Sequence, residues 1–116
     1  MSDDVIELEE VMERVQDDKE LLLELLDIFQ EDYREKRIKM DKLIQKQGFE
    51  ELKNIAHSLK GASSNISAKK IFVTFAKLED VAEKGNVEEI RQLIAQIDRQ
   101  YEELSQSIKK LKVDLS

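Results

Sequence analysis

The chain of 116 residues contains no proline and only three glycines, Gly48, Gly61 and Gly85. Proline and glycine mark most turns, so a chain with so few of them allows few reversals of direction. Sandwiches and barrels of short β-strands need many reversals and are therefore nearly excluded. Almost half of the residues are Ala, Glu, Lys, Leu or Arg, which is the composition of long helices. The sequence predicts an all-α protein with a single domain over residues 1–116.

Apolar residues recur every three or four positions, which is the spacing of amphipathic helices. The pattern predicts a short helix over residues 5–15, with Val5, Leu8, Met12 and Val15 on its apolar face. It predicts four longer helices over residues 17–46, 49–66, 68–84 and 87–111.

Short connections separate the predicted helices. Gly48 and Gly85 follow the last apolar positions of two helices, where glycine commonly forms the closing turn. Asp17-x-x-Glu20 and Asn86-x-x-Glu89 have the spacing of capping boxes. Short connections force neighbouring helices to run antiparallel. We therefore expect an antiparallel up-down-up-down four-helix bundle, with the short additional N-terminal helix covering an end or a groove. A long coiled coil is the structural alternative, and the glycines that interrupt its heptads weaken it.

The charge and composition exclude several classes of function. The net charge is −7, which disfavours nonspecific binding to nucleic acids. The chain has no cysteine and one histidine, which excludes cysteine-based and multi-histidine metal sites. Asp3 and Asp4 read as acids at a helix start rather than metal ligands, so we expect no metal and no cofactor. No apolar run approaches the roughly 18–20 residues of a membrane span, so we expect a cytoplasmic monomer that binds no membrane.

The single histidine, His57, lies within the predicted helix over residues 49–66. At about 100° per residue, it falls roughly 170° from the core direction that Leu52, Ile55 and Leu59 define. We therefore predict that His57 is exposed on the bundle surface. Its neighbours on the helical wheel are all small or polar: Lys53, Asn54, Lys60, Gly61 and Ser64.

A basic segment surrounds this histidine. No acidic residue occurs between Glu51 and Glu79, and five lysines give the segment a charge of +5, so the rest of the chain carries −12. A basic segment in an acidic protein predicts an anionic ligand or an acidic partner surface. Gly61, one turn after His57, costs about 1 kcal/mol relative to Ala inside a helix. The close approach of another molecule would explain this glycine, and a helix bend or a tolerated surface glycine is the alternative.

These residue types suit phosphoryl transfer. A neutral imidazole is a competent nucleophile toward phosphorus, and Lys60 can neutralise charge on the transferring oxygens. The chain has no phosphate-binding loop and no kinase motif, so a partner would have to supply the phosphoryl group. We expect no carboxylate beside His57 that could activate water, which favours a stable phosphohistidine.

The string His57-Ser58-Leu59-Lys60-Gly61-Ala62-Ser63, continuing through Ser67-Ala68, resembles the signature of histidine-containing phosphotransfer (HPt) domains. The segment over residues 22–29 and the downstream Leu78-Glu79, Ala82 and Gly85 are also similar to that family. The resemblance implies a bundle whose exposed histidine accepts a phosphoryl group from a receiver-domain aspartate and passes it to another receiver. It implies that Mg²⁺ belongs to the receiver and that the protein is a carrier rather than an enzyme.

By position, the resemblance makes His57 the phosphorylated residue, Lys60 the residue that stabilises phosphoryl charge and Gly61 the residue that gives the receiver access. The helical wheel adds Lys53, Asn54 and Ser64 as partner-binding residues. The implied partners are response-regulator receiver domains, a hybrid histidine kinase, or both. The family often has glycine where this chain has Ser67, and we expect Ser67 to cap the following helix and preserve the turn in altered form.

Three other interpretations remain open. The chain could be the phospho-accepting domain of a larger histidine kinase, including the chemotaxis type. It could be a non-catalytic helical adaptor that binds a partner through the His57 face, or a structural coiled coil. Four apolar residues that point outward on the second helix could pack against the first helix or bind a receiver: Leu21, Leu23, Ile28 and Ile38.

Overall fold

The computed structural model describes residues 5–115, and this range contains five helices and no strand. The helices are α1 (Leu8–Arg14), α2 (Lys19–Gln45), α3 (Phe49–Asn65), α4 (Lys69–Lys84) and α5 (Val87–Leu115). The predicted all-α class is confirmed. None of these helices is long and apolar enough to cross a membrane. The acids Asp3 and Asp4, expected at a helix start, lie outside the described residues.

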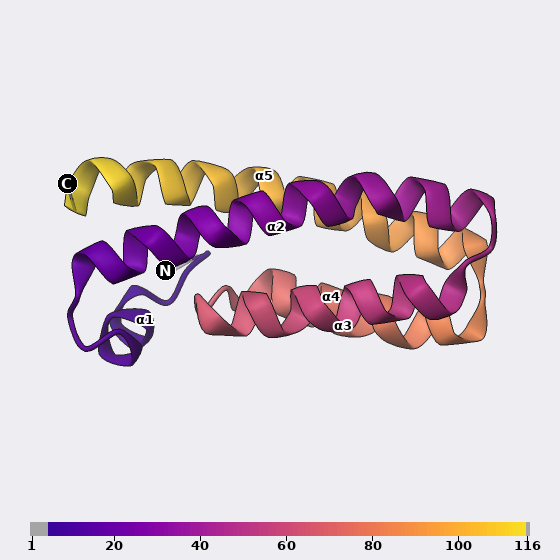
Figure 1. Ribbon diagram of the computed structural model, residues 1–116, viewed down its shortest axis with the longest axis horizontal. Helices are drawn as coiled ribbons and strands as arrows, with labels where there is room; N and C mark the ends of the chain where they lie inside the picture. Colours follow the sequence, from indigo (N-terminus) through magenta and orange to yellow (C-terminus); the bar gives the residue numbers. More distant parts are fainter. Residues whose placement is uncertain (1–4, 116) are drawn as a thin grey trace.

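Each of the four long helices packs against two others, in the pairs α2–α3, α3–α4, α4–α5 and α2–α5. Figure 1 shows α2 and α5 side by side along one side of an elongated molecule, with α3 and α4 along the other. The short helix α1 lies near the turn between α3 and α4, where the Glu7 backbone N–H donates to the Ser67 carbonyl oxygen at 3.0 Å. It covers this end of the bundle.

The core consists of the apolar stripes predicted for the four long helices. Their central residues are almost completely buried: Leu22, Leu26, Phe29, Met40, Leu52, Leu59, Phe75, Leu78, Ile90, Ile97 and Leu104. The stripe predicted for the first helix is only partly correct. Val15 is buried and Val5 and Met12 pack partly buried against the core, but Leu8 is 39% exposed and the completely buried Val11 was not predicted. Helix α1 starts at Leu8 and has only seven residues, too few turns for apolar spacing to define its buried face.

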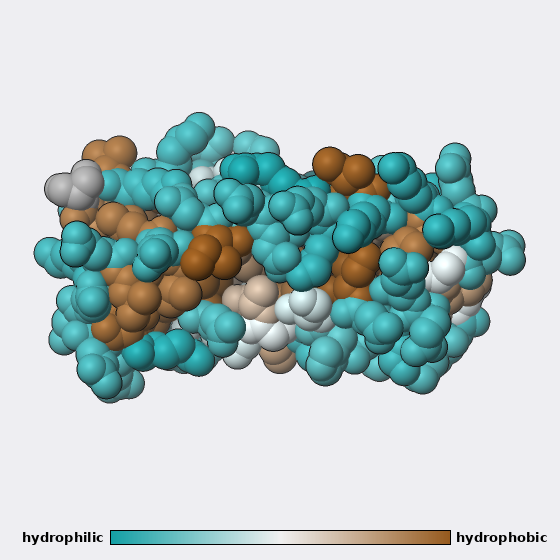
Figure 2. Space-filling view, in the orientation of Figure 1, coloured by the Kyte–Doolittle hydropathy of each residue, from teal (hydrophilic) through white to brown (hydrophobic). Residues whose placement is uncertain are grey.

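The outward apolar residues of α2 divide into two groups. Leu23 packs partly buried against the core. Leu21, Ile28 and Ile38 remain 38%, 57% and 64% exposed. Figure 2 shows an apolar area at the end of the molecule where α1 and the first half of α2 lie, on a face that is otherwise mostly hydrophilic.

The turn between α2 and α3 differs from the prediction. Gln47 is the left-handed residue, with φ of 57°, whereas Gly48 has φ of −81° and precedes α3. The Gly48 backbone N–H donates to the Leu43 carbonyl oxygen at 2.8 Å. A Cβ on Gly48 would lie 2.9 Å from Leu43 Cδ2. Close packing against Leu43, and not the left-handed conformation, therefore explains the glycine.

The helix caps were predicted partly correctly. Gly85 ends α4 in the left-handed conformation, with φ of 69°. Asn86 Oδ1 accepts from the Glu89 backbone N–H at 3.1 Å, and Asn86 Nδ2 donates to Glu89 Oε1 at 2.9 Å. The capping box on Asp17 is wrong by one residue. Asp18 is the N-cap of α2 and accepts from the Leu21 backbone N–H at 3.0 Å, while Asp17 is left-handed with φ of 61°.

The expected cap at Ser67 is also wrong. Ala68 occupies the N-cap position of α4 without a side-chain hydrogen bond. Ser67 is left-handed, with φ of 55°, which is the conformation that glycine adopts most easily. Its hydroxyl donates to Glu10 Oε2 at 2.8 Å, and Glu10 Oε1 lies 2.8 Å from Lys69 Nζ. These contacts attach α1 to the α3–α4 turn, and Lys69 and Ser67 hold the pKa of Glu10 below its usual value.

A polar network fixes α2 against α5. Arg37 binds Asp98 with two parallel hydrogen bonds, Nε to Oδ1 at 2.8 Å and Nη2 to Oδ2 at 2.9 Å. The Tyr33 hydroxyl donates to Asp98 Oδ1 at 3.4 Å, and the Tyr33 ring stacks on Tyr101 with centroids 4.0 Å apart. The Arg37 hydrogen bonds lower the pKa of Asp98, and burial raises the pKa of Tyr33. The paired geometry sets the register of the two longest helices.

Candidate functional site

Helix α3 presents His57 to solvent on the side opposite its buried stripe. The His57 side chain is 68% exposed. Leu52 and Leu59, on the other side of the same helix, have no exposed surface. The exposure predicted from the helical wheel is confirmed.

Glu79, on α4, joins the two functional side chains of α3. Its Oε2 lies 2.9 Å from His57 Nδ1, and its Oε1 lies 2.8 Å from Lys60 Nζ. The Glu79 side chain is only 18% exposed. The expectation that no carboxylate lies beside His57 is therefore wrong. Glu79 directly follows the core residue Leu78 and is the first acid after the basic segment. Its place next to the buried stripe of α4 is the sequence signal that could have indicated a contact with α3.

The hydrogen bonds around Glu79 assign the histidine tautomer. The hydrogen bond from Lys60 lowers the pKa of Glu79, with burial opposing it and the His57 bond adding to it. An ionised carboxylate only accepts hydrogen bonds, so His57 Nδ1 is the donor in this pair. The neutral ring then carries its lone pair on Nε2. Histidine and glutamate together present an unprotonated nitrogen on an exposed side chain.

The basic segment is largely neutralised by acids from other parts of the chain. Besides Lys60, Lys53 lies 2.8 Å from Glu83, which raises the pKa of Lys53. Lys69 Nζ lies 2.8 Å from a Glu10 oxygen, and Lys70 Nζ lies 3.6 Å from Glu103. The charge of +5 counted along residues 52–78 is therefore mostly paired within the protein. The acids that pair with these lysines come from α1, from the second half of α4 and from α5, and all of them lie outside residues 52–78, over which the charge was counted.

The remaining predicted residues lie on the exposed face of α3. Asn54, Gly61 and Ser64 are all exposed. A Cβ added to Gly61 would have no heavy atom within 4 Å outside its own helix backbone and chain neighbours. The surface beside His57 is therefore low and open at Gly61.

A second ion pair, missed in the sequence, flanks this face from α2. Lys36 Nζ lies 2.7 Å from Asp32 Oδ1 and donates to the Ser58 hydroxyl at 2.9 Å. Ser58 directly follows His57, so α2 places the paired Lys36 beside the histidine-bearing turn, and α4 places Glu79 there as the partner of Lys60 on α3. Within residues 5–115, no group of three or more acidic or histidine side chains is arranged to hold a metal ion.

Known proteins match both the sequence and the fold. The family model of the Hpt domain matches residues 24–107. The crystal structure of histidine-containing phosphotransfer protein B (HptB) from Pseudomonas aeruginosa PAO1 is similar, with a TM-score of 0.82 and 25% identity, over 98% of this chain and 96% of that chain. A rice protein described as a histidine-containing phosphotransfer protein shares the fold, with a TM-score of 0.83 and 16% identity, over 97% of this chain and 81% of that chain.

A comparison with curated protein sequences gave no significant match. The family match nevertheless spans most of the chain and includes α3, the Glu79 region of α4 and most of α2 and α5. Proteins of this family are phosphocarriers of two-component signalling and interact with receiver domains and kinases. The chain belongs to the Hpt domain family of histidine-containing phosphotransfer proteins.

Proposed function

We propose that this protein is a carrier in a multistep phosphorelay, which accepts a phosphoryl group on His57 from a receiver-domain aspartate and passes it to another receiver. The observation that supports this most directly is the hydrogen bond of 2.9 Å between His57 Nδ1 and Glu79. It leaves Nε2 with its lone pair on a side chain that is 68% exposed. A partner can therefore bring an aspartyl phosphate to this nitrogen without any rearrangement of the bundle.

The transfer step balances without an added proton carrier. The Nε2 lone pair forms the N–P bond while the P–O bond to the receiver aspartate breaks, and that aspartate leaves as a carboxylate. The ring becomes a phosphorylated imidazolium that keeps its proton on Nδ1. The Glu79 carboxylate faces this positive charge and stabilises it. Transfer to the next receiver runs the same step in reverse.

Lys60 has a second role in this proposal. It is paired with Glu79 in the unphosphorylated protein, and its side chain is 27% exposed. A short side-chain rotation lets its ammonium group reach the oxygens of a phosphoryl group on Nε2. Gly61 gives the receiver room to approach, and Lys53, Asn54 and Ser64 lie on the surface that the receiver covers.

The proposal also covers the domain organisation, the oligomeric state and the location of the protein. Residues 1–116 form one domain, an antiparallel up-down-up-down bundle that serves as a rigid support for α3. The protein acts as a cytoplasmic monomer and as a carrier, with no chemistry of its own beyond transfer. The same site would also serve the phospho-accepting domain of a larger histidine kinase. A purely non-catalytic adaptor is less well supported, because an adaptor has no use for a histidine whose tautomer a carboxylate fixes.

A phosphotransfer assay tests this function. Purified protein is mixed with receiver domains from the organism that encodes it, each phosphorylated beforehand with labelled acetyl phosphate. We expect at least one receiver to transfer label to the wild type, in a form that is labile to acid and stable to base. His57→Gln should acquire none. If no receiver labels the wild type, the carrier function is wrong, and if His57→Gln is labelled, the site is wrong.

A further inference from the structure

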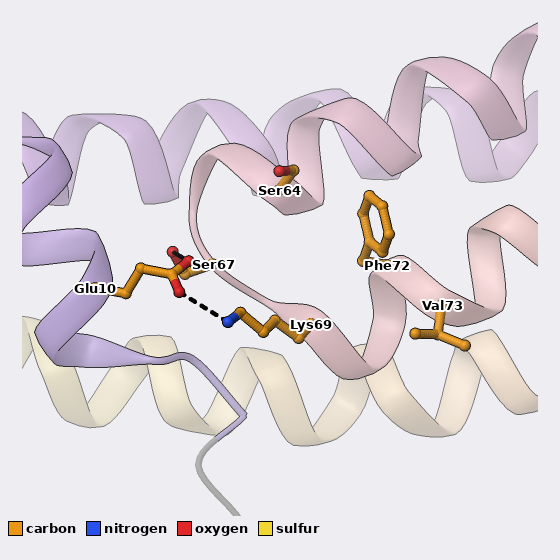
Figure 3. A pocket seen from close by; sticks show the side chains of 6 residues that line it. All are labelled: Glu10, Ser64, Ser67, Lys69, Phe72 and Val73. Atoms are coloured by element: carbon orange, nitrogen blue, oxygen red, sulfur yellow. Dashed lines mark hydrogen bonds and ion pairs between the residues drawn. The ribbon is translucent and has the colours of Figure 1, made fainter.

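We propose that a hollow between α3 and α4 is the docking site for an apolar side chain of the receiver domain. Six residues line it: Glu10, Ser64, Ser67, Lys69, Phe72 and Val73. The inference rests on the proposed function, since it names a second contact for the partner that meets His57. Figure 3 shows Phe72 extending from α4 toward α3 near Ser64, with Val73 on the next position of the same helix.

The register of the two helices places this hollow on the same side of the bundle as His57. Ser64 follows His57 by seven residues on α3, and Phe72 precedes Glu79 by seven residues on α4. Seven residues are two helical turns, so both residues keep the same facing and lie about 10 Å along the helix from the His57–Glu79 pair. The hollow therefore lies on the same side of α3 and α4 as the His57–Glu79 pair.

A receiver that reaches His57 would also cover the hollow. A protein interface of ordinary size buries about 800 Å² on each partner, which corresponds to a round patch of about 16 Å radius. The hollow, at about 10 Å, lies inside such a patch centred on His57. Gly61 lies between them and raises no obstacle, because a Cβ there would contact nothing within 4 Å beyond its own helix.

The chemistry of the hollow selects an apolar occupant. Val73 is 50% exposed, and Phe72 is half-buried. Three of the polar side chains at the rim are already paired with one another, since Glu10 accepts from Ser67 at 2.8 Å and binds Lys69 at 2.8 Å (Figure 3). A charged group entering the hollow would have to break these contacts or remain unpaired. An aliphatic or aromatic side chain removes the apolar surface from water and leaves the rim intact.

The size of the hollow agrees with one protein side chain. Its volume is about 270 Å³. Sites for drug-sized ligands usually have about 300–1,000 Å³ and bury most of the ligand, whereas this hollow is open along one side. Apolar anchors of this kind, placed in a pocket near the centre of an interface, carry much of the binding energy between proteins.

The experiment measures receiver binding and phosphoryl transfer in parallel. The probe is the receiver domain that labels the wild type fastest, used with Mg²⁺ and beryllofluoride for binding and in its phosphorylated form for transfer. Val73→Asp places a charge in the hollow, and we expect its Kd for the receiver to rise at least about 10-fold. Val73→Thr keeps the shape with less apolar surface and should raise Kd by about 3-fold. Labelling of His57 by phosphoramidate, which needs no receiver, should stay at the wild-type rate.

Val113→Asp is the matched control, because Val113 is 74% exposed and lies near the end of α5. Its Kd should equal that of the wild type. If both Val73 variants also bind with the wild-type Kd, the hollow is not a receiver contact, while wild-type transfer still upholds the carrier function. If the wild type exchanges phosphoryl groups with no receiver, the carrier function and this docking site both fail. A Val73→Asp variant that changes only self-association in sedimentation assigns the hollow to a second copy and overturns the proposal.

Discussion

Glu79 Oε2 lies 2.9 Å from His57 Nδ1 while Glu79 Oε1 lies 2.8 Å from Lys60 Nζ, so one carboxylate of α4 holds two side chains of α3. The imidazole and the ammonium group each bind a different oxygen of this carboxylate, so they do not compete. This sharing fixes the proton on one ring nitrogen and keeps the lysine within reach of the other. In the proposed carrier, the fixed proton leaves the other ring nitrogen free to attack phosphorus, and the nearby lysine is in place to bind the phosphoryl oxygens.

Glu79→Gln should slow phosphoryl transfer from the receiver about 10-fold, because an amide still accepts from Nδ1 but does not offset the charge of the phosphorylated ring. The rate is measured in single-turnover experiments with a phosphorylated receiver. Glu83→Gln is the control, since Glu83 pairs with Lys53 and not with His57. Equal rates for the two variants would show that the carboxylate does not assist transfer.

Lys60→Ala should slow transfer about 10-fold without unfolding the bundle, because the lysine is proposed to neutralise phosphoryl oxygens. Its ion pair with Glu79 lies at the surface, where such pairs contribute at most about 1 kcal/mol to stability. Lys60→Arg keeps the charge and should restore part of the rate. Transfer by Lys60→Ala at the wild-type rate would leave the lysine with a structural role only.

Gly61→Leu should keep or raise the free energy of unfolding and yet slow transfer at least about 10-fold. Glycine inside a helix costs about 1 kcal/mol relative to alanine, and the space around Gly61 is open, so the fold tolerates a larger side chain. The side chain would then stand where the receiver approaches. Gly61→Ala separates the two effects, because it gains helix stability with little obstruction. Stability is followed by urea denaturation, and an unchanged transfer rate for Gly61→Leu would remove the proposed access role.

Asp98→Asn should make the free energy of unfolding depend less on pH in the acid range. The folded-state pKa of Asp98 is lowered by Arg37. The stabilisation is therefore complete above the unfolded pKa of about 3.9 and is lost as pH falls through the lower folded value. Because the Asp98 side chain is 48% exposed, solvent screening limits the loss at pH 7 to about 0.5–1 kcal/mol. Urea denaturation at pH 7 and pH 2 checks this, and Asp80→Asn, on the exposed side of α4, controls for net charge. A loss for Asp98→Asn that is as large at pH 2 as at pH 7 would contradict the ion-pair origin.

Substitutions at the adjacent residues Gln47 and Gly48 should change the stability of the protein in opposite directions. Gln47→Gly should stabilise by about 1 kcal/mol, since it removes a side chain from the left-handed conformation. Gly48→Ala should destabilise by about 1–2 kcal/mol, because its Cβ would lie 2.9 Å from the buried Leu43 side chain. Thermal unfolding of both variants measures this. A stabilising Gly48→Ala would mean that Leu43 moves aside freely.

The periodicity of apolar residues was enough to predict features that depend on a single helix, such as its buried face. The wheel of α3 placed His57 outside the core because apolar spacing over 17 residues defines a clear buried direction. Gly85 and the Asn86–Glu89 cap were predicted because their contacts lie within three or four residues. Helix α1 has only seven residues and offers no such average, so its predicted apolar face was wrong at Leu8 and missed Val11.

Contacts between helices could not be read from the same pattern. Glu79 meets His57 across 22 residues of sequence, and Glu103 meets Lys70 from a different helix. Both pairings depend on rotation and register, which the packing of the core decides. The prediction of the turn at Gln47 and Gly48 was wrong for a related reason. The close contact with Leu43, and not the preference of glycine for left-handed backbone, explains Gly48.

Four of the six lysines of α3 and α4, including both lysines of α3, are paired with acids within the molecule, at Glu10, Glu79, Glu83 and Glu103. In the proposed carrier, an approaching receiver would therefore meet a histidine face on which the lysines of α3 are already neutralised at short range. Long-range attraction contributes little to the rate of encounter with such a face. Discrimination between correct and incorrect receivers then depends on shape and on the lifetime of the complex, and signal flow through the protein should change little with cellular ionic strength.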